Sequence, residues 1–85
     1  MAQSEGAWSP GVDMETTTLG RYRTVTSARQ AAEMLLFDWP ITHGRKYSKA
    51  QLECLRAMEG KGDIDKARSA FLDAAEEAGL FVRKH

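Results

Sequence analysis

Alternating hydrophobic and polar positions mark the first predicted element of the chain. Val12, Met14 and Thr16 fall on one face of an extended segment, and acidic or hydroxyl residues fall on the other. Period-two alternation and β-branched residues are typical of a strand. The same criteria predict a second strand over residues 22–26, after a turn that contains Gly20. The chain therefore begins with a predicted β-hairpin.

Two registers of this hairpin fit the turn. A three-residue loop ending in Gly20 pairs Glu15 with Arg23 and places Tyr22 on the inner face. A two-residue loop places Val25 on the inner face and turns Tyr22 outward. We favour the first register, because Gly20 suits its left-handed third position and because the facing side chains carry opposite charges.

Apolar residues at helical spacing predict three helices after the hairpin. The first begins at Ser27, where the sequence S-A-R-Q matches a capping box, and it ends before Pro40. A second capping box, S-K-A-Q, places the start of the second helix at Ser48. The third helix is capped by Asp63 and stopped by Gly79.

Alanine is frequent in the predicted helices, so the large side chains of the core must come from a few other positions. Small side chains let helix axes approach to about 8 Å. A few large side chains must then fill the interior, and the predicted ones are Leu35, Trp39, Leu55, Met58 and Phe71. Residues 80–82 are apolar and predict either a short third strand beside the hairpin or a tail that packs on the core.

Together these elements predict an α+β fold, in which an antiparallel β-hairpin packs on three α-helices in the order β-β-α-α-α. A length of 85 residues fits one domain, which we assign to residues 10–82. We expect residues 1–9 to form a loosely ordered N-terminal tail. Trp8 in this tail is either an anchor at an interface or the point where the tail docks on the core.

Charge and cysteine content narrow the classes of function. The formal net charge is zero, so we expect no general affinity for phosphate backbones. Residues 21–56 nevertheless contain seven bases and three acids, a local net charge of +4. The one cysteine, Cys54, cannot form an intramolecular disulfide, and residues 1–10 do not resemble a signal peptide. No apolar run approaches the roughly 20 residues that span a bilayer, so we expect a cytoplasmic protein.

Several motifs, in their order and spacing, resemble a known family. They are the segment LGRYRTVTSARQAAEMLLFDWP, then G-x-x-Y, A-x-x-x-C-L-x-A and A-R-x-A-F-x-x-A-A-E-E-A-G. Over about residues 8–80 the chain resembles the short bacterial proteins catalogued as domain of unknown function 982. The resemblance implies a fold of a β-hairpin and helices. It implies no activity, and no functional residue is carried over from it.

The connector before the second predicted helix carries the most suggestive polar cluster. Free N–H groups at a helix start, cationic side chains and a hydroxyl group can together bind a phosphate or a carboxylate. The pattern predicts a candidate anion-binding site at Gly44, Arg45, Lys46, Ser48 and Lys49. A solvated loop is the alternative interpretation.

No set of residues predicts catalysis, a metal centre or a cofactor site. His43 lies in the connector without a second histidine nearby in the sequence. Cys54 falls in an apolar helical stripe and is predicted to be a small buried hydrophobic residue. Asp73, Glu76 and Glu77 lie opposite the apolar stripe of the third helix, where we expect a solvated face. We therefore expect a chain that is not an enzyme.

Two functions remain as hypotheses. A small core and open strand edges favour a non-catalytic protein-interaction or regulatory module, which binds a protein partner or a second copy of itself. The alternative is weak binding of nucleic acid or another anion through the basic region Arg21–Lys49. Its basic side chains are Arg21, Arg23, Arg29, Arg45, Lys46 and Lys49.

Overall fold

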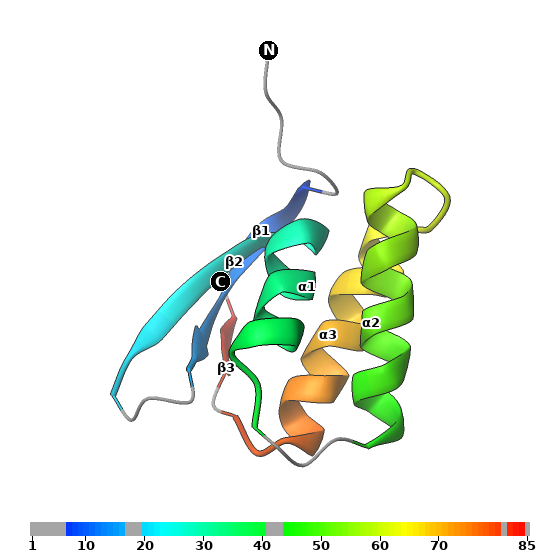
Figure 1. Cartoon of the computed structure of the whole chain (residues 1–85). Coiled ribbons are helices and arrows are strands. Elements are labelled where there is room, and N and C mark those ends of the chain that lie inside the picture. Colours follow the sequence, from blue (N-terminus) through cyan, green and yellow to red (C-terminus); the bar gives the residue numbers. More distant parts are fainter. Residues whose placement is uncertain (1–6, 17–19, 41–43, 81, 85) are drawn as a thin grey trace.

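The computed structural model describes residues 7–16, 20–40, 44–80 and 82–84. Its elements are β1 (Ala7–Glu15), β2 (Tyr22–Ser27), α1 (Ala28–Phe37), α2 (Arg45–Met58), α3 (Ile64–Glu77) and β3 (Val82–Lys84). The strands form an antiparallel sheet in the order β2-β1-β3. The three helices lie on one side of this sheet (Figure 1). The predicted α+β fold is confirmed, and residues 82–84 form the third strand.

The helices form two levels above the sheet. α1 and α3 pack on the strands, whereas α2 packs on α1 and α3 and lies away from the described strands (Figure 1). Because α2 is supported from one side only, its opposite side and the adjoining side of α1 face outward. This outward region is where the candidate site lies.

The favoured hairpin register is wrong by one residue. Val12 lies opposite Val25, and Glu15 lies opposite Tyr22 instead of Arg23. A one-residue slip exchanges the two faces of a strand. The observed register buries Val25 completely and leaves Tyr22 50% exposed. Burying a valine side chain contributes about 1.5–3 kcal/mol, which exceeds the roughly 0.2–1 kcal/mol of the cross-strand charge pair that favoured the other register.

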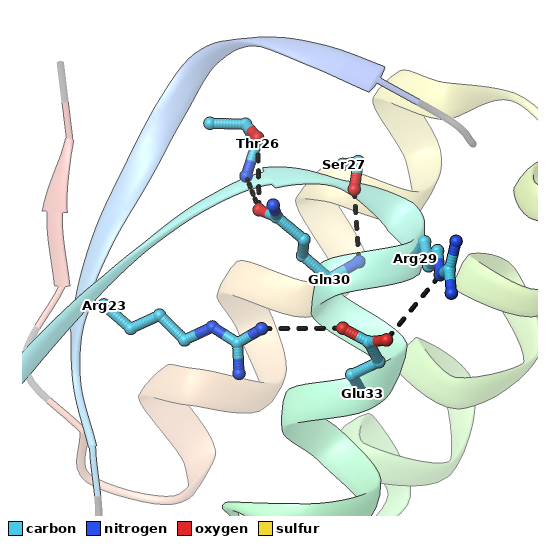
Figure 2. Close-up of polar contacts among 6 residues, drawn as sticks. All are labelled: Arg23, Thr26, Ser27, Arg29, Gln30 and Glu33. Carbon is cyan, nitrogen blue, oxygen red and sulfur yellow. Dashed lines mark hydrogen bonds and ion pairs between the residues drawn. The ribbon is translucent and has the colours of Figure 1, made fainter. Parts of the chain in front are cut away.

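The observed register also redirects Arg23. Its partner across the ladder is Met14, so Arg23 shares the inner face and reaches α1. There Arg23 Nη2 lies 3.5 Å from Glu33 Oε1, and Arg29 Nε lies 3.6 Å from Glu33 Oε2 (Figure 2). All three side chains are partly exposed, so each ion pair contributes less than about 1 kcal/mol. Gly20 retains the left-handed backbone predicted for it, with φ at 80°.

β1 begins five residues before the alternation that predicts it. Ala7–Ser9 therefore belong to the sheet and not to the tail in which the pattern places them, while residues 1–6 lie outside the described residues. Trp8 is buried, its indole N–H donates to the Val25 carbonyl oxygen at 2.9 Å, and its ring centroid lies 6.0 Å from that of Phe71. Trp8 is thus a core residue, which corrects its interpretation as an interface anchor. A buried indole with a satisfied N–H adds apolar area to a small core.

The sequence correctly predicts the starts of α1 and α3. The Ser27 hydroxyl oxygen accepts the backbone N–H of Gln30 at 3.1 Å, and Gln30 Oε1 accepts the N–H of Thr26 at 2.7 Å (Figure 2). At the start of α3, Asp63 Oδ1 accepts the N–H of Asp65 at 2.8 Å. Both caps satisfy donors that have no partner within the helix.

The core contains most of the predicted large residues. Leu35 and Phe71 are fully buried, and Trp39 and Met58 are partly buried against them. The prediction for Leu55 is wrong, because its side chain is 51% exposed. α2 buries a stripe of smaller residues together with one tyrosine: Tyr47, Ala50, Cys54 and Ala57.

Candidate functional site

An apolar groove runs along the outer surface where α1 meets α2. Its volume is about 420 Å³. The groove is lined by Ala32 and Leu36 of α1 and by Ser48, Gln51, Leu52 and Leu55 of α2. We call it the leucine groove.

Large apolar side chains on the rim of this groove are open to solvent. Leu36 is 63% exposed, Leu52 is 53% exposed and Leu55 is 51% exposed. Phe37, the next residue of α1 after Leu36, is 83% exposed. Single exposed hydrophobic residues are ordinary on protein surfaces, but a cluster of them around a groove marks an interaction site.

Helix geometry explains why these leucines are exposed. The buried stripe of α2 includes Cys54, and at 3.6 residues per turn Leu52 and Leu55 project from other sides of the helix. On α1, Ala32 provides a small side chain at the floor of the groove, one turn before the exposed Leu36. Ala32 faces the two leucines of α2 across the groove, and its small side chain leaves a hollow that the described residues do not fill.

A buried hydrogen bond holds the two walls of the groove together. The Tyr47 hydroxyl of α2 donates to the Leu35 carbonyl oxygen of α1 at 2.6 Å. Gln51, which lines the groove, donates from Nε2 to the same Tyr47 oxygen at 3.1 Å. The Tyr47 ring also lies 6.1 Å from the ring of Trp39. These contacts hold α2 against α1, so the groove is an ordered feature of the fold.

A row of basic side chains flanks the groove on α2. Arg45, Lys49 and Arg56 share one stripe with Leu52, because positions 45, 49, 52 and 56 follow the spacing i, i+4, i+7 and i+11. All three basic side chains are exposed, and none makes an ion pair with another residue in the described part of the chain. We call them the basic row.

At the predicted anion site, a carboxylate of the protein itself accepts the backbone N–H groups. α2 begins at Arg45, three residues before the capping box that was expected to start it at Ser48. The exposed N–H groups of this helix start are used within the protein: Lys46 N–H donates to Glu77 Oε2 at 3.4 Å and Tyr47 N–H donates to Glu77 Oε1 at 3.3 Å. The carboxylate of Glu77 therefore lies at the N–H groups to which an external anion would bind, and the helix start predicted at Ser48 is wrong. The side chain of Glu77 is exposed, as predicted.

The members of that predicted site have different neighbours. Gly44 is the N-cap and contacts the Glu77 carboxylate, while Arg45 and Lys49 belong to the basic row. Ser48 lines the leucine groove. Lys49 also borders a polar depression between α2 and α3 together with Glu53, Lys66, Ser69, Ala70 and Asp73.

The remaining candidate residues take no part in the groove. Cys54 is fully buried, and burial, with a smaller contribution from Glu53, raises the pKa of its thiol to about 12. Such a thiol is protonated at neutral pH and is a poor nucleophile. His43 lies outside the described residues. Asp73 and Glu76 are exposed on α3.

Two further observations concern the described residues as a whole. No group of three or more His, Cys, Asp or Glu residues among them is placed to hold a metal ion. None of the helices described is long and apolar enough to cross a bilayer.

Sequence reasoning missed the leucine groove. The pattern predicts Leu55 in the core and places Leu36 with the apolar stripe of the first helix. The sequence of α2 contains a signal for the groove. Packing on α1 and α3 requires one apolar side, but α2 has apolar residues on two sides of the helix. Which side faces outward depends on how α2 lies on α1 and α3, and the sequence pattern does not contain this information.

The fold and the groove define a small α+β domain with an exposed apolar site on its helical side. A family model described as "Protein of unknown function (DUF982)" matches residues 11–82, and the chain belongs to this family. The match confirms the resemblance carried by the sequence motifs. Comparison with curated proteins and with solved structures found no match. Function must therefore be argued from the groove itself.

Proposed function

We propose that this chain is a small, non-catalytic protein-interaction module whose contact surface is the leucine groove. The observation that carries the proposal is the clustering of Leu36, Leu52 and Leu55, each more than half exposed, around one groove. A domain of this size buries only about 60–65% of the surface that its unfolded chain exposes, so its core is small. Three leucines left in water keep their apolar area out of that core. A protein partner that covers them recovers this area.

We propose that the module is cytoplasmic. Its only cysteine is Cys54, which cannot form an intramolecular disulfide and is buried. Small extracellular domains usually depend on disulfides for stability.

Nucleic-acid binding through Arg21–Lys49 has less support. Arg23 and Arg29 are engaged by Glu33, and the N–H groups at the start of α2 are engaged by Glu77. In the described residues, the basic side chains of this region that have no ion pair are divided between Arg21 at the hairpin and the exposed surface of α2, where Leu52 lies within the basic row. An apolar residue within the row suits a protein surface better than a phosphate backbone.

Photocrosslinking in the native host cell tests the proposal. A photoreactive amino acid replaces Leu52 in one variant and Asp73, which is exposed on α3, in the matched control. We expect discrete protein adducts from position 52 and none from position 73. We also expect the adducts from position 52 to disappear when Leu55→Asp is added. A folded protein that gives no adduct at position 52, or the same adducts at both positions, would falsify the proposal.

A further inference from the structure

We infer that the occupant of the leucine groove is an acidic amphipathic helix of another protein. This inference rests on the proposed function and adds the chemical class of the partner. The groove lies between two helices and presents leucines from both of its walls. A surface of this kind accepts the apolar side chains that a partner helix presents at i, i+3 or i+4, and i+7.

Charge complementarity indicates that acidic residues flank the apolar side of that helix. The basic row runs beside the groove from Arg45 to Arg56, which corresponds to about three helical turns, or roughly 16 Å along α2. Among the described residues of the α1 side, Glu33 is held by Arg23 and Arg29, and Asp38 at the end of the helix also has a partner. A partner helix that lies along the groove with Asp or Glu on the side facing α2 meets unpaired positive charge over this whole length.

The same charges disfavour a second copy of the chain. A two-fold contact that lays α2 on its counterpart would bring the two basic rows together, and like charges repel. A two-fold contact that lays α2 on α1 would bring each basic row to a helix whose acids, Glu33 and Asp38, already have partners. The exposed acids of the chain do not favour a contact between the groove of one copy and α3 of another. On α3, Asp65, Asp73 and Glu76 are exposed, but no large apolar side chain of this helix is exposed with them. A separate protein can combine leucines and acids on one helix.

The experiment uses two fluorescent amphipathic peptides and the full chain. Both peptides carry leucine at helical spacing, and the flank beside the leucines is glutamate in one and glutamine in the other. At low ionic strength we expect the glutamate peptide to bind about tenfold more tightly by fluorescence anisotropy, because two or three exposed ion pairs contribute that much. The difference is expected to shrink as salt is added.

Matched variants separate the electrostatic contribution to peptide binding from the apolar contribution. Arg45→Glu combined with Arg56→Glu is expected to abolish the preference for the glutamate peptide. Arg21→Glu combined with Arg83→Glu changes the net charge equally at exposed positions on the sheet side of the molecule, which α2 does not contact, and is expected to preserve it. Leu55→Asp is expected to weaken the binding of both peptides. Circular dichroism verifies that each variant is folded.

The outcomes separate the inference from the proposed function. Equal binding of both peptides, lost in Leu55→Asp, would overturn the acidic partner and leave the groove as a protein-binding site. Crosslinks from position 52 without binding of either peptide would do the same. Sedimentation that changes with concentration and is restored to a monomer by Leu55→Asp would overturn it in favour of a second copy. Binding of a short DNA duplex that Leu55→Asp does not affect, without adducts at position 52, would overturn both.

Discussion

The carboxylate of Glu77, at the end of α3, occupies the space that a Cβ atom at Gly44 would fill. From this position Glu77 accepts the N–H groups of Lys46 and Tyr47 and caps α2 from a different helix. A negative charge is favourable at a helix N-terminus and unfavourable at a C-terminus. The contact therefore connects the end of α3 to the start of α2 and holds the outer helix of the fold in place.

Removal of this cap should destabilise the protein. We expect Glu77→Ala to lower the free energy of unfolding by about 0.5–2 kcal/mol, the usual cost of losing an N-cap. Glu76→Ala is the matched control, because Glu76 precedes Glu77 on α3 and its side chain is exposed. Urea denaturation followed by circular dichroism measures both. Equal effects of the two substitutions would show that Glu77 does not act as a cap.

The contact between Gly44 and Glu77 can be tested separately by a double-mutant cycle. Gly44 has an extended backbone, with φ at −121°, so alanine at this position carries no backbone strain. Its methyl group would instead displace the Glu77 carboxylate. We expect Gly44→Ala to cost about 1 kcal/mol in the native background and little in the Glu77→Ala background. Additive effects would contradict the contact.

Two neighbouring leucines of α1 should differ sharply in their contribution to stability. Leu35 is 1% exposed and lies in the core, whereas Leu36 is open to solvent at the leucine groove. We expect Leu35→Ala to lower the free energy of unfolding by about 2–5 kcal/mol and Leu36→Ala to change it by less than about 0.5 kcal/mol. Thermal and urea denaturation measure this difference. A comparable loss in both variants would place Leu36 in the folding core.

Trp8 and Trp39 should respond differently to replacement by phenylalanine. Trp8→Phe removes the indole donor to the Val25 carbonyl, and we expect a loss of about 1–3 kcal/mol. Trp39→Phe is the control, because Trp39 Nε1 is buried without a hydrogen-bond partner among the described residues. Unfolding monitored by the fluorescence of the remaining tryptophan gives both values. A smaller loss for Trp8→Phe than for Trp39→Phe would contradict the role of the Trp8 hydrogen bond.

The buried thiol of Cys54 should make the protein less stable at high pH. Burial raises its pKa from 9.0 to about 12, so the folded state keeps the proton that the unfolded state loses. The stabilisation is complete below pH 9 and is lost as the pH rises from about 9 to about 12, by at most about 1.4 kcal/mol per pH unit. We expect Cys54→Ala to be less stable at pH 7 but to lose stability less steeply above pH 9. Parallel stability curves for the two proteins would refute the assignment.

Local patterns predicted much of the fold. The start of α1 at Ser27 and that of α3 at Asp63 were predicted because each cap is made by residues within four positions of one another. The start of α2 was not predicted, because Glu77, which caps it, lies about thirty positions away in the sequence. The strand positions were predicted by alternation. The favoured register relied on the fit of Gly20 to a three-residue loop and on the charge pair of Glu15 and Arg23, and it was wrong by one residue.

The sequence by itself determined the fold class, the three helices and the hairpin, because periodicity, caps and turn residues act over a few positions. Only the tertiary structure decided the register of the hairpin, the place of the first strand residues and which side of α2 is buried. Val25 displaced Tyr22 from the inner face, Trp8 entered the core, and Leu55 was turned outward beside Leu36. The leucine groove and the Glu77 cap arise from the way α2 packs on α1 and α3. Such packing depends on the simultaneous fit of side chains distant in sequence, which no local pattern records.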